Sequence, residues 1–230
     1  MQVRNLALRF CFQTVFWLGV MAVMLLAGAD DTSWPQAWAF LILFAIGSAG
    51  FGVWLIRRDP ALLAARLGRL SQPGQPLWDK LFLLIFVALW LVWLWVMGRD
   101  AKVWQVSHMP FGLNVFGGLM LVIGFLGVAR VFKENTFAAP VVRVQTERRQ
   151  RVVDTGPYAR VRHPMYAYAL FYLFGTPLLL GSWLGMAGAL VMVLGLMGRI
   201  VREEEMLTQR LAGYDEYRAR VRYRLIPRIW

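Results

Sequence analysis

Six long stretches of apolar residues, separated by charged segments, constrain the fold of this chain more than any other feature. They cover residues 10–29, 36–56, 81–97, 111–129, 165–180 and 183–198. A helix needs about 20 apolar residues to cross the hydrocarbon core of a bilayer, and most of these stretches approach that length. Hydrophobic residues make up 59% of the chain and charged residues only 17%, which is typical of a membrane protein. The sequence therefore predicts an all-α, polytopic membrane helical bundle with about six transmembrane helices.

The first apolar stretch resembles a secretory signal peptide, because Arg4 and Arg9 precede it and Ala27-Gly28-Ala29 ends it. Its uncharged part is nevertheless about 17 to 20 residues long, which exceeds the apolar region of most signal peptides. We expect this stretch to be retained as a transmembrane helix.

Basic residues are concentrated in alternate loops. The segments rich in Lys and Arg are the N-terminus and residues 57–80, 130–164 and 199–230. Because such segments stay in the cytoplasm, both termini are predicted to be cytoplasmic, as in an integral, multi-pass protein of the inner membrane if the source is bacterial. A short interfacial helix is expected from Pro60, and a C-terminal cytoplasmic helix in the tail up to Pro227. The net charge of +12 is then explained by anionic lipid, and nucleic acid is not an expected partner.

The chain divides into two parts with different contents. Residues 1–132 form an N-terminal transmembrane region of four spans and an interfacial loop, in which glycines of the fourth span favour close helix packing. Residues 133–230 contain a basic loop, a helical hairpin with its turn at Gly181-Ser182, and a charged tail. Cys11 is the only cysteine and histidines number two, so we expect no disulfide and no metal site.

Two charged clusters flank the predicted hairpin. The first is the segment 156–166, which contains two arginines, a histidine and two tyrosines, and the second is the segment 199–207, which contains two arginines and three adjacent glutamates. Ionisable groups at a membrane boundary are costly unless they are solvated or paired. Because both clusters lie at the base of one hairpin, we expect them to meet there and form a candidate active site on the cytoplasmic side.

The first cluster has the residues of an anion and cofactor site. Pro164 suits the first turn of a helix, whose free N–H groups favour a carboxylate or phosphate. Arg162 can hold the same anion with two parallel hydrogen bonds. Tyr158 and Tyr166 can stack on a nucleobase or face a cation such as a sulfonium. Anchoring at the membrane interface is the alternative role of these side chains.

The second cluster combines opposite charges on one helical face. Arg199 and Glu203 are four residues apart and can pair. Glu203 or Glu204 can balance a cationic cofactor, while Arg199 holds an anionic acceptor. A solvated helix start is the alternative explanation of the three glutamates.

The order of these motifs resembles that of the isoprenylcysteine carboxyl methyltransferase and phospholipid methyltransferase superfamily. The motifs are Tyr158, Arg162-His163-Pro164, Tyr166, the apolar hairpin and the later charged motif. The charged motif consists of Arg199, Glu203, Glu204 and Leu207, and the resemblance covers roughly residues 141–230. The resemblance implies an integral membrane enzyme that uses S-adenosylmethionine. No strand followed by G-x-G-x-x-G is present, so a Rossmann cofactor domain is not expected.

The resemblance also implies roles for individual residues. The cofactor would be bound by Gln150, Arg151, Val152, Val153, Tyr158, Arg162, His163, Pro164, Met165, Tyr166 and Glu203, and the catalytic residues would be Arg199, Glu203 and Glu204. Relatives often have a histidine where Gln150 or Arg151 stands, and the tail segment Leu211-Ala212-Gly213-Tyr214 also departs from the family pattern.

The implied reaction is methyl transfer to a lipophilic acceptor, a small molecule or a membrane lipid. A carboxylate acceptor oriented by Arg199 is favoured, and it needs no general base. Phospholipid or amine N-methylation is the alternative, in which a glutamate or His163 assists deprotonation. A reductase of the sterol-reductase type with bound NADPH is a further alternative, which the acidic run disfavours, and a non-catalytic membrane scaffold is the last.

Overall fold

The computed structural model describes residues 3–230, and every regular element within them is helical. Its elements are α1 (Val3–Ala29), α2 (Pro35–Arg58), α3 (Pro60–Arg66), α4 (Leu77–Gly98), η1 (Arg99–Trp104), α5 (Phe111–Glu134), η2 (Thr146–Arg148), η3 (Gly156–Ala159), α6 (Pro164–Leu180), α7 (Trp183–Arg210) and α8 (Tyr214–Arg220). Each predicted apolar stretch lies in its own long helix. The prediction of an all-α membrane bundle is therefore confirmed.

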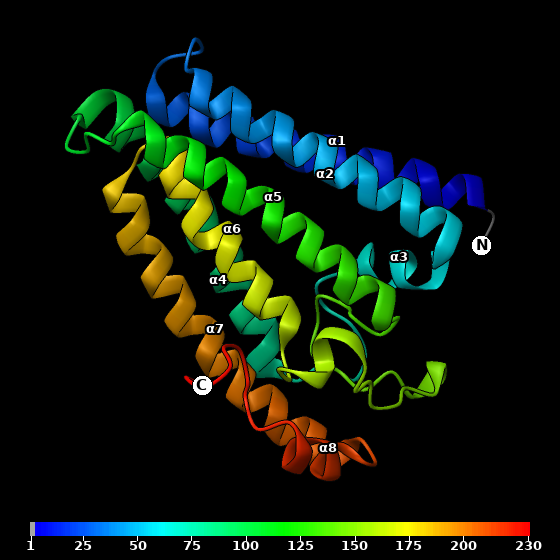
Figure 1. The fold of residues 1–230 in the computed structure, drawn as a ribbon. Coiled ribbons are helices and arrows are strands. Elements are labelled where there is room, and N and C mark those ends of the chain that lie inside the picture. Colours follow the sequence, from blue (N-terminus) through cyan, green and yellow to red (C-terminus); the bar gives the residue numbers. More distant parts are fainter. Residues whose placement is uncertain (1–2) are drawn as a thin grey trace.

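Five of these helices are long and apolar enough to cross a membrane, namely α1, α2, α4 with η1, α5 and α7. The sixth predicted span, α6, is an apolar helix of only 17 residues. The turns between α1 and α2 and between α6 and α7 lie at one end of the bundle, whereas α3, α8 and the loop after α5 lie at the other (Figure 1). The basic segments thus share one end, and its cytoplasmic location stays a prediction.

The short helix α6 is held against α5 by small residues. A side chain at Gly117 would collide with α6, since an added Cβ atom would lie 2.6 Å from the carbonyl oxygen of Gly175. Gly127 likewise faces the ring of Tyr168 with no room for a methyl group. The close packing expected of the glycines in this span is therefore present at these two positions.

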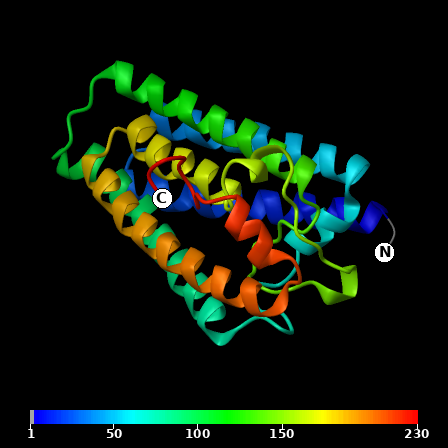
Figure 2. The same cartoon turned by 60° about the horizontal axis from the view of Figure 1, so that its bottom comes forward.

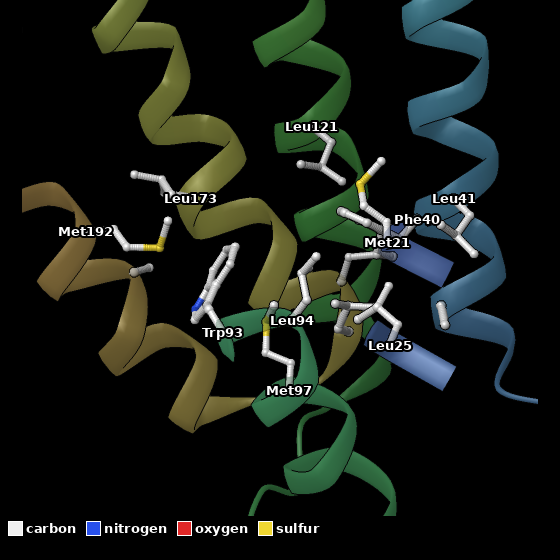
Figure 3. Close-up of a cluster of buried hydrophobic side chains, with 14 of the residues drawn as sticks. Met21, Leu25, Phe40, Leu41, Trp93, Leu94, Met97, Leu121, Leu173 and Met192 are labelled. Carbon is white, nitrogen blue, oxygen red and sulfur yellow. The ribbon is translucent and has the colours of Figure 1, made fainter. Parts of the chain in front are cut away.

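The apolar core of the bundle includes one face of α4, which packs mainly against α1 and α7 (Figure 3). Trp93 of α4 donates a hydrogen bond of 2.6 Å from its indole nitrogen to the carbonyl oxygen of Gly185 in α7. Leu94 and Met97 are fully buried beside it. The other labelled members of this core are Met21, Leu25, Phe40, Leu41, Leu121, Leu173 and Met192.

Asp100 organises the turn of the predicted hairpin at the opposite end of the bundle from the basic segments. Its buried carboxylate accepts hydrogen bonds from the hydroxyl groups of Ser107 at 2.6 Å and Ser182 at 2.5 Å. Ser182 also caps α7 by accepting a hydrogen bond from the backbone of Gly185. Gly181 has a φ of +79°, which favours glycine, so the tight turn has a local explanation.

The tail differs from its prediction. A single helix up to Pro227 was expected, but α7 extends to Arg210, the chain turns at Gly213 with a φ of +80°, and only the short α8 follows. The residues after α8 then return to the start of α6, where Arg162 and His163 donate backbone hydrogen bonds of 2.9 Å to the carbonyls of Tyr223 and Arg224. Figure 2 shows α8 and this returning segment beside the loop that follows α5.

Candidate active site

A cavity lies at the end of the bundle where the loop after α5, the base of the α6–α7 hairpin and α8 come together. Its volume is about 820 Å³, counting the open mouth. The predicted residues that line it are Gln150, Arg151, Val152, Val153, Tyr158, Arg162, His163, Met165, Tyr166, Arg199 and Glu203. Both charged clusters therefore contribute to one wall, whereas Pro164 and Glu204 do not line this cavity.

Glu204 lies behind the wall and is only 2% exposed. Its carboxylate accepts hydrogen bonds from Arg162 at 2.6 and 3.2 Å and from Arg224 at 2.9 Å, and one of its oxygens lies 3.1 Å from Nε2 of His163. Two cations and an imidazole compensate this one charge. Glu204 thus joins α7 to the start of α6 and to the returning tail.

Arg162 has its donors occupied within the protein. The Nε and Nη2 atoms bind Glu204, and Nη1 donates to the carbonyls of Val221 at 2.7 Å and Arg222 at 2.8 Å. The two parallel hydrogen bonds expected for a ligand anion are thus made to Glu204 instead. Arg162 borders the cavity with a side chain that already holds three segments together.

Arg199 is paired with a residue that sequence reasoning missed. The expected pairing with Glu203 is absent among the described residues, because Nε of Arg199 donates to Asp79 at 2.9 Å and Nη2 to the carbonyl of Pro140 at 2.7 Å. Asp79, which is fully buried in the first turn of α4, also accepts hydrogen bonds from Val142 and Gln75 at 2.8 Å each. The charge of Arg199 is therefore compensated, although the side chain still lines the cavity.

Glu203 is the only acid among the described residues that line the cavity. Its carboxylate accepts a hydrogen bond of 2.7 Å from the hydroxyl of Tyr166, and no cationic side chain within residues 3–230 forms an ion pair with it. Of the adjacent glutamates, Glu204 is enclosed by cations and Glu203 is not. The negative charge of Glu203 is thus available to a positively charged ligand.

Four tyrosines give the cavity aromatic walls, namely Tyr166, described above, and Tyr158, Tyr214 and Tyr217. The hydroxyl of Tyr158 accepts a hydrogen bond of 2.7 Å from Asn135, and the hydroxyl of Tyr217 donates one of 2.8 Å to the Tyr158 carbonyl. Tyr214 differs, because its buried hydroxyl has no hydrogen-bond partner among the described residues. Burial raises the pKa of the Tyr158, Tyr214 and Tyr217 phenols above the ordinary value, so they remain neutral donors at physiological pH.

The loop strip from Gln150 to Val153 is fixed by a buried amide. Gln145, only 1% exposed, donates from its backbone to the side-chain oxygen of Gln150 at 2.7 Å and from its side chain to the carbonyl of Phe137 at 2.8 Å. The side-chain oxygen of Gln150 is thus used within the loop.

The lining residues outside the predicted set are Asn135, Phe137, Ala138, Ala139, Val141, Val142, Arg143, Met206, Leu207, Leu211, Tyr214 and Tyr217.

This arrangement can bind a molecule that carries both a positive charge and an apolar or aromatic part. Glu203, which forms no ion pair within residues 3–230, attracts the charge, and the tyrosine rings can contact a cation or a planar ring system. The buried hydroxyl of Tyr214, which has no hydrogen-bond partner among the described residues, is a second indication of a ligand site, because such groups are rare in proteins.

Part of the chain matches a known protein family. Residues 113–213 match the family model described as phospholipid methyltransferase, and this range contains most of α5, all of α6 and α7, and most of the residues that line the cavity. The matched range begins within the fourth predicted span, and the helices α1 to α4 lie outside it. No curated protein matches the chain.

Proposed function

We propose that the protein transfers a methyl group from S-adenosylmethionine to a lipid acceptor, because residues 113–213 match the phospholipid methyltransferase family model. Glu203 is the observation that carries this proposal. It is a carboxylate without an ion pair among the described residues, on a cavity wall that contains tyrosines, which suits a sulfonium cofactor. A site for NADPH would be expected to present only basic side chains to the cofactor phosphates, and the charge of Glu203 disfavours it.

The cavity residues fit the cofactor in charge and in hydrogen-bonding capacity. When bound, S-adenosylmethionine supplies a methyl group on a positively charged sulfur that departs with the bonding electron pair. Glu203 would oppose the positive charge, and the hydroxyl of Tyr214 would gain the partner that it lacks. Exposed Arg151 would hold the amino-acid carboxylate, and the rings of Tyr158 and Tyr166 would contact the remainder of the molecule.

An amine is the acceptor that the charges around the cavity support best. The carboxylate acceptor relied on Arg199, whose charge Asp79 already compensates, whereas Glu203 would attract an ammonium group as well as a sulfonium. The match of residues 113–213 to the phospholipid methyltransferase family also favours an amine acceptor. A carboxylate remains the second candidate, because Arg199 lines the cavity and Nη1 has no acceptor among the described residues.

An amine must lose a proton before its lone pair can attack the methyl carbon. We assign this step to His163, which lines the cavity. With Nε2 of His163 at 3.1 Å from Glu204, the tautomer that donates from Nε2 leaves Nδ1 as a free acceptor. Glu204 would then act through His163 as a positioning residue. Proton transfer of this kind typically contributes about 10²- to 10⁴-fold in rate.

We also propose that this cavity faces the cytoplasm. It opens at the end of the bundle that collects the basic segments, and lysine and arginine are enriched in cytoplasmic loops. That side of the membrane also contains the soluble cofactor.

Binding of two cofactors by the purified full chain in detergent tests the proposal. We expect S-adenosylmethionine to bind and NADPH not to bind when both are titrated calorimetrically. Transfer of a labelled methyl group to amine-bearing or carboxylate-bearing lipids would then identify the acceptor. Binding of NADPH alone would support the reductase alternative, and binding of neither would support a scaffold.

A further inference from the structure

A second hollow lies between helices of the bundle, beside the cavity described above. It runs between α1, α2, α5 and α6 and ends against α3, with a volume of about 1320 Å³ counting its open side. The side chains that line it are mostly apolar and aromatic, among them Phe10, Trp17, Met21, Phe44, Phe51 and Phe132. We call this hollow the lipid groove.

Arg66 lines the lipid groove at its α3 end. Its guanidinium lies 4.5 Å from the centre of the Phe132 ring, and Nη1 donates a hydrogen bond of 2.8 Å to the carbonyl of Ala138. The same nitrogen lies 3.9 Å from the sulfur of Met165. Ala138 and Met165 both line the candidate active site, so Arg66 lies at the boundary between the two hollows.

No carboxylate within residues 3–230 pairs with Arg66. Two cations of the candidate active site differ in this respect, since Arg162 pairs with Glu204 and Arg199 with Asp79. Burial lowers the pKa of Arg66 to about 10, which leaves it cationic at neutral pH. Arg66 is only partly exposed, and a cation in such a position is costly without a counter-charge. An arginine fork suits a planar or tetrahedral oxyanion. The described residues therefore provide no counter-charge for Arg66, and an anionic ligand could supply one.

We propose that Arg66 binds the phosphate of the acceptor lipid, with the acyl chains of that lipid in the groove. The groove is apolar and lies between membrane-spanning helices, so its occupant is a membrane lipid rather than free phosphate. Because Met165 lines both hollows, a headgroup amine attached to that phosphate would extend toward the candidate active site. The identity of the amine rests on the proposed methyl transfer, whereas the binding of the phosphate does not.

Lipid retention by the purified full chain tests this inference. Native mass spectrometry in a neutral detergent would compare phosphatidylethanolamine with diacylglycerol, which has the same chains and no phosphate. We expect the phospholipid to be retained preferentially and Arg66→Ala to lower its affinity about tenfold or more, since a charge-assisted hydrogen bond is lost. Arg66→Lys should recover part of the affinity because it keeps the charge without the planar fork.

Arg69→Ala is the matched control, because Arg69 lies three residues further along the chain, is exposed and does not line the groove. It should bind the phospholipid as the unmodified chain does. Ser48→Phe adds a large side chain to the groove wall, far from the charge, and should weaken retention of the phospholipid while Arg66 is intact.

Cooperative chemical unfolding of Arg66→Ala in detergent shows that the variant is folded. Equal retention of phospholipid and diacylglycerol, equal loss in the Arg69→Ala control, or full competition by inorganic phosphate would overturn the inference. Failure of the unmodified chain to bind S-adenosylmethionine would instead overturn the proposed function. The lipid measurements would still decide the role of Arg66 in that case.

Discussion

Arg199 of α7 donates a hydrogen bond of 2.9 Å to Asp79 of α4, although 120 residues separate them in the chain. Both side chains are buried, and Asp79 also accepts the backbone N–H of Val142 from the loop over the cavity. The pair therefore connects the matched methyltransferase region to a helix outside it. The sequence motif assigns Arg199 to acceptor binding, but the structure shows that Arg199 also holds the wall of the site in place.

Removal of one partner of this pair should destabilise the protein. Asp79→Asn leaves the cation of Arg199 buried without a counter-charge, a change that typically costs about 3–5 kcal/mol. Chemical unfolding in detergent measures the loss. The double variant Asp79→Asn with Arg199→Met should lose less than the sum of the two single variants. Additive losses would show that the two side chains do not interact.

Glu203→Gln should weaken binding of S-adenosylmethionine more than binding of S-adenosylhomocysteine. Only the first ligand carries the sulfonium charge, and removal of a charge-assisted contact costs roughly 1.5–3 kcal/mol. Calorimetric titration of both ligands gives the comparison. Glu205→Gln is the control, since Glu205 is exposed and does not line the cavity. An equal loss for both ligands would mean that Glu203 supports the wall through Tyr166 instead.

The long helices and the apolar core could be predicted from the sequence because each apolar stretch is a local signal. The pairing of Arg199 with Asp79 could not, since nothing local to either residue indicates a partner in another helix. Its only signal was a single acid at the start of an apolar span. The sequence also could not predict which of the adjacent acids Glu203 and Glu204 faces the cavity, because this depends on the rotation of α7 against its neighbours. The return of the tail to Arg162 likewise depends on tertiary packing.

The two ends of the bundle should lie on opposite sides of the membrane. Reporter fusions after Trp230 and within the turn at Ser182 should report the cytoplasmic and the opposite side, respectively, because the basic segments lie with the C-terminal end. This topology leaves Arg99 and Lys102 outside, and the ion pair of Lys102 with Asp31 at 2.7 Å balances one of these two charges. Reports of the same side from both fusions would contradict the arrangement.

His163→Ala should lower the turnover number for an amine acceptor by about 10²-fold or more while the affinity for S-adenosylmethionine changes little. The imidazole is assigned to proton removal because Glu204 occupies its Nε2 side. Separate measurement of turnover and cofactor affinity distinguishes this role from cofactor contact. A loss of affinity with unchanged turnover would assign His163 to the cofactor.

Tyr214 and Tyr217 should respond in opposite directions when their hydroxyl groups are removed. The hydroxyl of Tyr214 is buried without a partner, so Tyr214→Phe should stabilise the ligand-free protein by roughly 1–3 kcal/mol. The hydroxyl of Tyr217 donates to the Tyr158 carbonyl, so Tyr217→Phe should destabilise it by about 1 kcal/mol. Chemical unfolding without ligand compares the two variants, which remove the same atom from two tyrosines on one face of α8.

Tyr214→Phe, which should stabilise the ligand-free protein, should weaken binding of the cofactor. If the cofactor supplies the missing partner, Tyr214→Phe binds S-adenosylmethionine more weakly than the unmodified chain even though its ligand-free state is more stable. Stability and affinity then change with opposite sign in one variant, which a simple packing defect does not produce. Unchanged affinity together with increased stability would mean that the Tyr214 hydroxyl takes no part in the site.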